Sequence, residues 1–421
     1  MCHDCLVMTK ISDISTDVLV IGAGPAGSST AAWCARLGID VLLVDAQIFP
    51  RDKACGDGLT PRAVKELNTL GLGTWLDGRA RNTGLCANGF GKTLHLPWPG
   101  GSLPNYGSAA PRLELDAVIR ETAIQSGAKT IEGARAFDVE MQDDKIKAVL
   151  FKKETGDLRI LAKRVVVADG AKSQLGRVLN RQWHKDTVYG VAARGYVASE
   201  RSDDPWITSH LELRDAENKI LSGYGWIFPL ADGNVNIGVG TLATTKRPAD
   251  INLRQLMDFY TDSQREEWKL SGEIQKPWSA LLPMGGAVSN VAGNNWVFVG
   301  DAAGCVNPLN GEGIDYGLET GRLAAEYFAT NPSDMTTTWP EILRENYGLA
   351  FSAARRIGGI LTSAEFLKIA GPIGMRSTWL MEIALRIMGN LVTDKDKDSL
   401  ARLWRSLGKL SISLDHRKPF S

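Results

Sequence analysis

The strongest constraint on the fold is a glycine-rich turn that joins an apolar run to a small-residue helix near the start of the chain. The run DVLVI leads into GAGPAG, which places Gly22, Gly24 and Gly27 at GxGxxG spacing. An Ala- and Ser-rich helical pattern follows, stops at a glycine, and is succeeded by a second apolar run that ends at Asp45. Residues 17–45 are therefore expected to form a β-α-β unit, whose parallel strands need a sheet covered on both faces.

This turn has the chemistry of a phosphate-binding site. The first glycine permits the tight turn, the second lets backbone approach a pyrophosphate, and the third lets helix and sheet pack closely. The helix N-terminus offers free N–H groups and the positive end of a dipole. Asp45 lies 18 residues after Gly27, where an acidic side chain can hydrogen-bond ribose hydroxyls. Together these features predict a dinucleotide-binding site.

Two later segments repeat the pattern of an apolar strand that ends in an aspartate-containing turn. They are VVVADGAKSQLGR at 165–177 and WVFVGDAAGCVNPLNGEGI at 296–314. In the second, Asp301 could reach the sugar or pyrophosphate part of a cofactor, and Gly311 and Gly313 let backbone N–H groups approach a ring. Taken singly, the ADG segment could be a simple turn and Asp301 could be a helix N-cap. The order in which these motifs follow one another along the chain favours a cofactor site.

The chain is long enough for more than one domain. Its 421 residues exceed the size at which a single core usually stops growing. Gly and Pro punctuate residues 84–107, strand-like runs with turn signals fill 186–283 as an antiparallel layer, and the end is helical. We predict a discontinuous first domain that comprises residues 15–83, 108–183 and 284–335. A second domain is built from residues 84–107 and 184–283, and residues 336–421 form a C-terminal helical region.

Composition and spacing exclude several classes of function. Lys plus Arg and Asp plus Glu number 48 each, so no attraction for nucleic acid is expected. Six scattered cysteines, without a recognisable secretory signal, favour a reduced, intracellular protein. CHDC at residues 2–5 lacks the further ligands of a zinc site, so no metal is predicted. GLCANGFGKT ends like a phosphate loop, but Cys86 stands where that motif needs its first glycine.

The three spaced motifs GxGxxG, ADG and GDA resemble those of flavoproteins with the p-hydroxybenzoate hydroxylase type of fold, over nearly the whole chain. The resemblance implies an α/β fold with a Rossmann-like FAD-binding domain, an antiparallel β-sheet substrate domain and a C-terminal helical region. It also implies FAD as the cofactor, with Arg112 in PRLELD near the ribityl–phosphate segment. The residues implied to bind FAD are Gly22, Gly24, Pro25, Ala26, Gly27, Asp45, Ala46, Arg51, Cys55, Gly56, Arg112, Ala136, Asp169, Gly170, Gly300, Asp301, Pro308, Gly311, Gly313 and Ile314.

Two more segments are similar to the geranylgeranyl reductase branch of these flavoproteins. FPRDKACGDGLTPRA at 49–63 resembles its loop, and YGWIFPLADGNVNIGVG at 224–240 matches its YxWxFP…GxG signature. LLPMGGAVS and NPLNGEGIDYGLETGRLAAE further resemble reductases of the isoprenoid tail of menaquinone. The resemblance implies an enzyme that saturates a carbon–carbon double bond in a polyprenyl chain, of menaquinone or a related prenyl lipid. Alternatives are a reductase of other geranylgeranyl lipids, an FAD-dependent monooxygenase or halogenase, and a non-enzymatic prenyl-binding escort protein.

The signature segment has a clear local structure. Two apolar runs flank an Asp-Gly turn and are expected to form a β-hairpin. Alternation puts Tyr224, Trp226 and Phe228 on one face of the first strand, in an aromatic row that ends at Pro229. Core packing explains such a row, but beside an FAD framework the row is better interpreted as the wall of an apolar tunnel. These four residues are the predicted substrate-binding residues.

The reaction implied needs a proton as well as a hydride. An isolated alkene has no carbonyl to take up developing charge, so hydride transfer from reduced flavin N5 has to be paired with delivery of a proton. Tyr224 is one hypothetical acid, and Cys55 is another because the related loop places a cysteine close to the site. Structural packing explains both as well. With Trp226 they form the catalytic candidates. No second dinucleotide motif is present, so the electron donor is unknown.

The C-terminal region contains MRSTWLMEIALRIMGNLV at 375–392, which is apolar around most of a helix. Core packing and an edge that dips into a bilayer surface both explain this stretch. A prenyl-lipid substrate favours the second, so we expect a peripheral contact on the cytoplasmic side of the cell membrane. No transmembrane helix is predicted.

Overall fold

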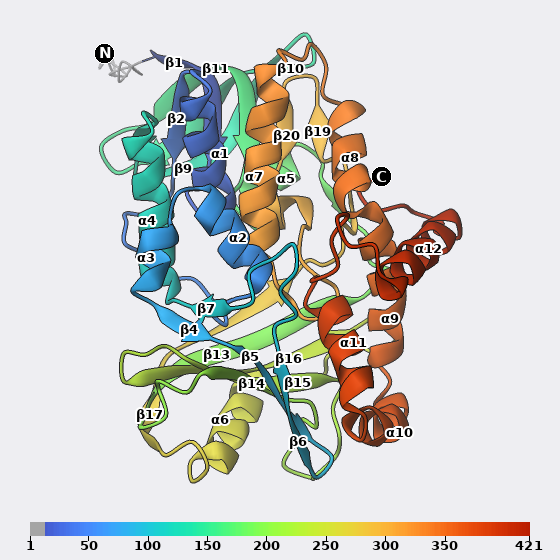
Figure 1. The fold of residues 1–421 in the computed structure, drawn as a ribbon. Helices are drawn as coiled ribbons and strands as arrows, with labels where there is room; N and C mark the ends of the chain where they lie inside the picture. Colours follow the sequence, from blue (N-terminus) through green and yellow to red (C-terminus); the bar gives the residue numbers. More distant parts are fainter. Residues whose placement is uncertain (1–12) are drawn as a thin grey trace, which may run out of the picture.

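The computed structural model describes residues 13–421 and contains two large β-sheets, one above the other, with the C-terminal helices along one flank (Figure 1). The CHDC segment lies outside the described residues. Within this range no helix is long and apolar enough to cross a membrane. Nor do His, Cys, Asp and Glu side chains gather anywhere in residues 13–421 as a metal site would require.

The upper sheet contains the predicted β-α-β unit. β1 (Asp13–Ile21) and β2 (Val41–Val44) are parallel, and α1 (Pro25–Arg36) connects them. All four residues of β2 are buried, and this explains why the run is continuously apolar. The strand order is β19-β20-β11-β1-β2-β8, and β10 and β9 continue from β11 as antiparallel strands. The other strands are β8 (Lys129–Ile131), β9 (Ala134–Gln142), β10 (Lys145–Lys153), β11 (Leu158–Val167), β19 (Ala292–Gly293) and β20 (Trp296–Phe298).

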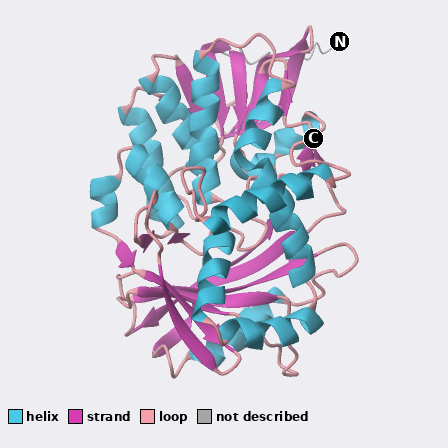
Figure 2. Ribbon diagram, turned by 45° about the vertical axis from the view of Figure 1, so that its right-hand side comes forward, coloured by secondary structure: helices cyan, strands magenta, loops and turns pink. Residues whose placement is uncertain are grey.

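Figure 2 shows several helices beside the strands of the upper sheet, and among them α1 contacts both α4 and α7. The close packing depends on small residues: a Cβ on Gly321 of α7 would overlap the backbone of α1. The helices are α2 (Pro61–Thr69), α3 (Gly73–Asp77), α4 (Arg112–Gln125), α5 (Gln174–Val178), α7 (Ile314–Ala329) and the 3-10 turn η1 (Gly300–Ala303). Two small sheets, β3-β7-β4 and β12-β18, link the halves, with bounds β3 (Gly58–Leu59), β4 (Ala80–Asn82), β7 (Gly107–Ala109), β12 (Gln182–Trp183) and β18 (Val288–Ser289).

The lower sheet has seven strands in the order β17-β13-β16-β15-β14-β5-β6. Helix α6 (Leu253–Gln264) packs against one face through Met257 and Tyr260, which leaves the other face toward the upper domain (Figure 1). The predicted antiparallel layer is confirmed for the strands between residues 189 and 282, and at its edge β14 pairs in parallel with β5. The chain enters β5 and β6 from the upper domain, so the direction of these two strands depends on the path of the chain through the whole fold. The strands are β5 (Gly84–Gly89), β6 (Lys92–Pro97), β13 (Tyr189–Ser199), β14 (Trp206–His210), β15 (Gly223–Pro229), β16 (Asn234–Ala243) and β17 (Leu270–Leu282).

The C-terminal region is helical, as predicted, but it is divided between the two halves. Trp339 and Phe420 are buried in the core of the upper domain. Met375, Leu385 and Leu391 instead pack against the edge strands β5 and β6. Core packing explains only part of residues 375–392, since Leu385 is the one buried residue of α11. The elements are α8 (Thr338–Leu343), the π-turn η2 (Arg344–Gly348), α9 (Leu349–Leu361), α10 (Ala364–Met375), α11 (Thr378–Met388) and α12 (Ser399–Ser413).

Candidate active site

The glycine turn after β1 is built for a close approach of backbone to a ligand. Gly22 has φ +100°, where a side chain would be strained, and a Cβ there would overlap the carbonyl of Ala168 at the end of β11. A Cβ on Gly27 would overlap the carbonyl oxygen of Gly22. No side chain caps the N-terminus of α1, so its first N–H groups are free for an anion. The residues present therefore fit the pyrophosphate of a dinucleotide.

Asp45 lies at the carboxyl end of β2, beside this turn. Its Oδ2 accepts a 2.6 Å hydrogen bond from Ala23 N, and its Oδ1 accepts one of 2.8 Å from Gln47 N. The carboxylate is thus held in a fixed position at the edge where a ribose would lie. Ala46 follows it directly, and Ala136 lies two residues beyond Ala134, whose N–H donates to the carbonyl of Asp45.

Arg112 and Asp116 form a buried ion pair at the start of α4. Arg112 donates from Nε and Nη2 to the two carboxylate oxygens at 2.6 and 2.7 Å, and Arg51 donates to the same carboxylate at 2.6 Å. Burial alone would raise the pKa of Asp116, but Arg112, Arg51 and Lys53 outweigh it and hold the pKa below its usual value. Arg112 lines the large cavity, whereas Arg51 is turned to Asp116.

The two aspartate-containing turns differ in how they use their carboxylates. Asp301 lines the cavity and forms an ion pair with Lys53, Oδ2 to Nζ, at 3.0 Å. Asp169 accepts a hydrogen bond from Gln174 N at 3.1 Å and does not line the cavity. The simple-turn interpretation therefore describes the side chain of Asp169, while the adjacent Gly170, at φ +80°, lines the cavity with its backbone.

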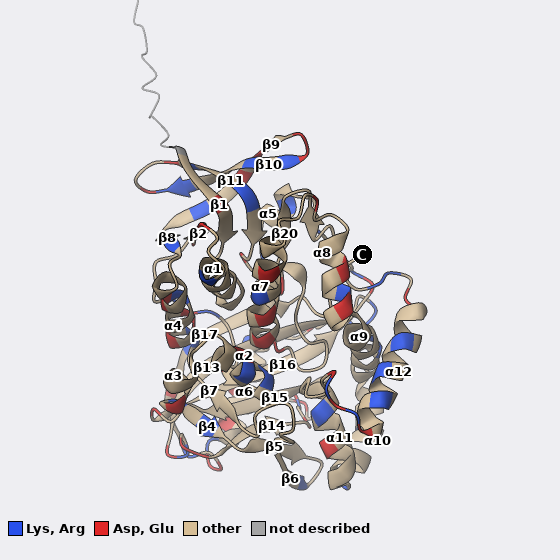
Figure 3. Ribbon diagram, turned by 45° about the horizontal axis from the view of Figure 1, so that its top comes forward, with Lys and Arg blue, Asp and Glu red and all other residues tan. Residues whose placement is uncertain are grey.

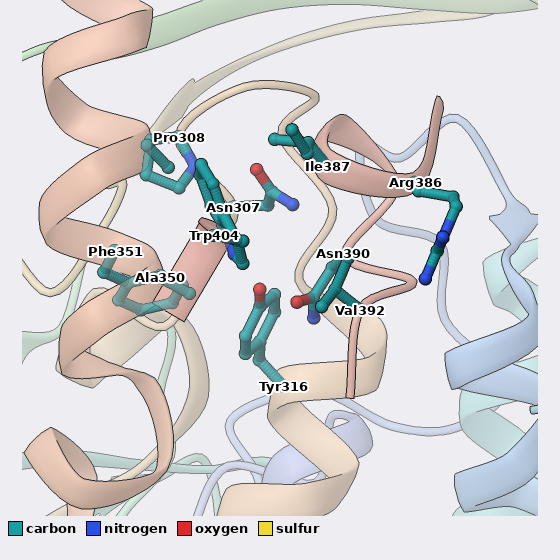
Figure 4. A pocket seen from close by; sticks show the side chains of 11 residues that line it. Asn307, Pro308, Tyr316, Ala350, Phe351, Arg386, Ile387, Asn390, Val392 and Trp404 are labelled. Carbon is teal, nitrogen blue, oxygen red and sulfur yellow. The ribbon is translucent and has the colours of Figure 1, made fainter. Parts of the chain in front are cut away.

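The loop before α7 brings Gly311, Gly313 and Ile314 to the cavity. Pro308 lies elsewhere: it borders a second, small cavity of about 10 Å³ together with Tyr316 and Trp404 (Figure 4). Of the predicted FAD residues, those that line the large cavity are Gly24, Pro25, Ala26, Cys55, Gly56, Arg112, Gly170, Gly300, Asp301, Gly311, Gly313 and Ile314. Those that lie outside its lining are Gly22, Gly27, Asp45, Ala46, Arg51, Ala136, Asp169 and Pro308.

The predicted hairpin and its aromatic row are confirmed. β15 and β16 pair antiparallel, and the centroids of the Tyr224 and Trp226 rings lie 6.0 Å apart, those of Trp226 and Phe228 6.3 Å apart. All three side chains line the large cavity. Pro229 does not: it is buried outside the lining, because successive residues of a strand point to opposite faces. Pro229 as a substrate-binding residue is therefore wrong.

The two glycines of the signature make room for the row. Trp226 pairs across the hairpin with Gly238, and Tyr224 with Gly240. A Cβ on Gly238 would overlap the indole of Trp226. Trp226 Nε1 also donates to Oδ1 of Asn236 at 2.9 Å, so both the space and the orientation of the indole are determined by β16.

A buried polar network, which the sequence motifs did not reveal, lies beside this row, and its central residue Asp57 also lines the cavity. Oδ2 of Asp57 accepts from the hydroxyl of Tyr196 at 2.6 Å and from the amide of Asn236 at 2.9 Å, and the same amide donates to the carbonyl of Cys55. Burial raises the pKa of Asp57 to about 6 and also raises the pKa of the Cys55 thiol. Asp57 stands in the CGDG of the predicted loop, which was the signal available. The network joins that loop to strands β13 and β16.

Glu312 is the second titratable residue that sequence reasoning missed. It stands between Gly311 and Gly313 and lines the large cavity with Tyr224 and Thr60. Its Oε1 accepts a 2.5 Å hydrogen bond from Thr60, while its buried Oε2 has no partner within residues 13–421. Burial, followed by the charge of Asp315, raises its pKa well above the usual value. Burial thus favours the protonated form of Glu312.

The large cavity extends from the glycine turns to the C-terminal helices and has a volume of about 550 Å³. Past the aromatic row its walls are almost wholly apolar. They combine the edge strands of the lower sheet with α10 and α11, and include Leu85, Leu96, Ile207, Leu367, Met375 and Met381. A cavity of this size and lining suits an extended hydrocarbon chain next to a cofactor.

Comparison with known proteins agrees with this geometry. The family model described as an FAD binding domain matches residues 15–330. The chain is 58% identical to the menaquinone reductase of Mycolicibacterium smegmatis over 407 residues, 96% of this chain and 99% of that protein. It is 56% identical to the menaquinone reductase of Mycobacterium tuberculosis over 409 residues, 97% and 99% of the two chains. A digeranylgeranylglycerophospholipid reductase of Methanopyrus kandleri is 26% identical over 84% of this chain and 92% of its own.

Solved structures share the fold at lower identity. A geranylgeranyl bacteriochlorophyll reductase-like protein from Thermoplasma acidophilum has a TM-score of 0.77 at 19% identity, with 94% of this chain and all of that chain covered. A flavin-dependent brominase has a TM-score of 0.74 at 21% identity, with 94% and 98% covered. Such low identities show the fold alone, whereas the two menaquinone reductases match 96% and 97% of this chain at 58% and 56% identity. The chain is an FAD-dependent oxidoreductase that belongs to the menaquinone reductase family.

Proposed function

We propose that this enzyme saturates one carbon–carbon double bond in the isoprenoid tail of menaquinone. The observation that supports the proposal is the continuous apolar cavity, which begins at the FAD-binding turns, passes the row Tyr224, Trp226 and Phe228, and continues between the lower sheet and α10–α11. A prenyl tail has no polar handle, so shape and apolar contact have to position it.

The residues of the row position the tail in this proposal. Phe228 and Trp226 pack on the loop glycines, since a Cβ on Gly56 would lie 3.2 Å from Phe228 and 3.3 Å from Trp226. The hydroxyl of Tyr224 donates to the carbonyl of Asn310 at 2.7 Å. The aromatic rings therefore bridge the Cys55 loop and the loop before α7, and they form a fixed surface against which a trisubstituted alkene can lie.

Bound and reduced FAD supplies the hydride for the reaction. The chain itself has to supply the proton, and burial favours the protonated form of three acids that line the cavity, Glu312, Cys55 and Tyr224. The hydroxyl of Tyr224 already donates a hydrogen bond to the carbonyl of Asn310. Oε1 of Glu312 accepts from Thr60, so a proton on this carboxyl would reside on Oε2, which has no acceptor in the described part of the chain. We therefore assign proton delivery to Glu312 ahead of Cys55 and Tyr224.

The substrate would reach the cavity from a lipid surface. Helices α10 and α11 line the cavity and also expose apolar side chains that lie outside its lining: Ile369, Ile373 and Trp379. An exposed apolar face around the mouth of a lipid-binding cavity suits contact with the interfacial layer of a bilayer. We propose a peripheral position on the cytoplasmic side of the cell membrane.

The experiment is a single-turnover assay analysed by mass spectrometry. Dithionite-reduced, FAD-loaded protein is mixed with menaquinone and, separately, with geranylgeranyl lipids, and each product is examined for a gain of two hydrogens. Gain with menaquinone supports the proposal. Gain only with the other lipids would assign the enzyme to a different prenyl substrate. Oxygen insertion under aerobic conditions with NADPH, with no gain in either lipid, would refute reduction as the activity.

A further inference from the structure

Helix α12, near the C-terminus, has an exposed apolar stripe that neither FAD nor the prenyl chain uses. Leu403, Leu407, Leu410 and Leu414 are 56%, 45%, 58% and 65% exposed. Their spacing of four, three and four residues places them on one face of the helix. A second face, with Ala401, Trp404, Gly408 and Ser411, is buried, and α12 packs on α9. The stripe is thus fully formed and has no partner among residues 13–421.

The charge of this helix is unusual for a chain whose net charge is zero. The sequence SLARLWRSLGKLSIS contains Arg402, Arg405 and Lys409 and no acidic residue. Arg405 donates to the carbonyls of Thr393 and Asp396, whereas Arg402 and Lys409 are exposed and pair with no carboxylate of the described chain. Figure 3 shows the basic positions recurring along α12. The exposed face therefore combines leucines with uncompensated positive charge.

We propose that α12 is an interfacial helix that binds an anionic bilayer surface, with its leucines in the acyl boundary and its basic side chains at the lipid phosphates. A second copy of this chain fits less well, because two such helices would bring like charges together without an acidic residue to offset them. The inference rests on the proposed function, since a membrane-resident substrate gives the contact its purpose.

The helix is also well placed to act with the cavity mouth. Figures 1 and 3 both show α12 on the same flank as α11 and α10. Arg386 of α11 forms a 2.6 Å ion pair with Asp398, which caps the N-terminus of α12 by accepting from Ala401 N. A bilayer bound by α12 would therefore lie beside the helices that line the cavity and expose Trp379.

The test measures binding of the full-length, FAD-loaded protein to vesicles without any substrate. Vesicles of phosphatidylcholine alone and with phosphatidylglycerol are sedimented with wild type, with Leu407→Glu/Leu410→Glu and with Arg402→Gln/Lys409→Gln. We expect wild type to prefer the anionic vesicles. The leucine variant should lose more than about tenfold in partitioning, and the charge variant about fivefold per removed charge, with a weaker salt dependence. Leu37→Glu/Met141→Glu, which changes two exposed apolar residues of the upper domain, should bind like wild type.

Equal binding of wild type and both α12 variants, or no preference of wild type for anionic vesicles, would overturn the proposal. A dimer in sedimentation velocity that the leucine variant abolishes, with vesicle binding unchanged, would instead assign the stripe to a second copy. Because vesicle binding is measured without substrate, the result is independent of prenyl reduction: loss of the reductase activity in wild type would refute the proposed function and leave the binding result intact.

Discussion

The indole of Trp226 occupies the space that a side chain on Gly238 would need. The two residues face each other across the β15–β16 hairpin, and a Cβ on Gly238 would overlap the ring. We expect Gly238→Ala to displace Trp226 and to lower the free energy of unfolding by about 1–3 kcal/mol. Urea unfolding measures this, and tryptophan fluorescence reports the displaced ring. Gly359→Ala in α9 is the matched control, because no atom lies within 4 Å of its Cβ; a similar loss there would contradict the steric argument.

Replacing Trp226 distinguishes a role in positioning the substrate from a role in core packing. Trp226→Ala opens the cavity beside the prenyl chain while the glycine turns that hold FAD are untouched. We expect kcat/KM for prenyl reduction to fall by at least about tenfold, with FAD content, read from the visible absorbance, near that of wild type. Trp226→Phe keeps an aromatic surface but removes the hydrogen bond to Asn236, so its kcat/KM should lie between those of wild type and Trp226→Ala. Parallel loss of FAD and activity would assign the row to core packing.

Proton delivery can be assigned by comparing three variants. Glu312→Gln preserves the shape of the neutral carboxyl and an acceptor for Thr60 but has no acidic proton. We expect its single-turnover reduction rate to fall by roughly 10²–10⁴-fold, with FAD content unchanged. Infrared difference spectra should show a protonated-carboxyl band in wild type that is missing in this variant.

Tyr224→Phe and Cys55→Ala are the comparisons, since each removes one rival proton donor. Both should keep most of the single-turnover rate, and Glu312→Asp should restore part of it relative to Glu312→Gln. If Tyr224→Phe or Cys55→Ala abolishes reduction while Glu312→Gln does not, the proton comes from the sequence-predicted residue.

Asp57 makes stability depend on pH in a defined window. Its pKa is raised by burial from 3.8 to about 6, so the folded state binds its proton more tightly than the unfolded state. The stabilisation is complete below the unfolded pKa and is lost as pH rises through about 6, on the order of 2–3 kcal/mol in total. Asp57→Asn keeps an acceptor for Tyr196 and Asn236 and does not titrate. Its stability relative to wild type, measured by urea unfolding, should therefore rise between pH 4 and pH 7; a constant difference would show that the carboxyl does not titrate there.

The exposed face of α10 and α11 predicts a difference between membrane-bound and detergent-dispersed substrate. Ile369→Ser and Ile373→Ser change residues that are exposed and lie outside the cavity lining. The double variant should reduce vesicle-embedded menaquinone at least roughly tenfold more slowly than wild type, and detergent-dispersed menaquinone at the same rate. Equal rates in both assays would argue against entry of the substrate through this face.

The features that the sequence determined by itself are those set by neighbouring residues. Gly22, Gly24 and Gly27 require a tight turn and close packing wherever such a strand meets such a helix, and the alternation of Tyr224, Trp226 and Phe228 follows from the period of a β-strand. Because successive residues of a strand point to opposite faces, Pro229 does not line the cavity that Phe228 lines. These rules act over a few residues, so they can be applied before any fold is known.

Tertiary structure decided the features that join distant segments. Asp57 meets Tyr196 and Asn236 only because β13 and β16 pass behind the Cys55 loop, and Glu312 meets Thr60 across 252 positions of the chain. The parallel pairing of β14 with β5 and the closure of the cavity by α10 and α11 likewise depend on the route of the chain. Burial then altered the chemistry: it raises the pKa of both Glu312 and Asp57, because the cost of a buried charge depends on the surrounding fold and not on adjacent residues.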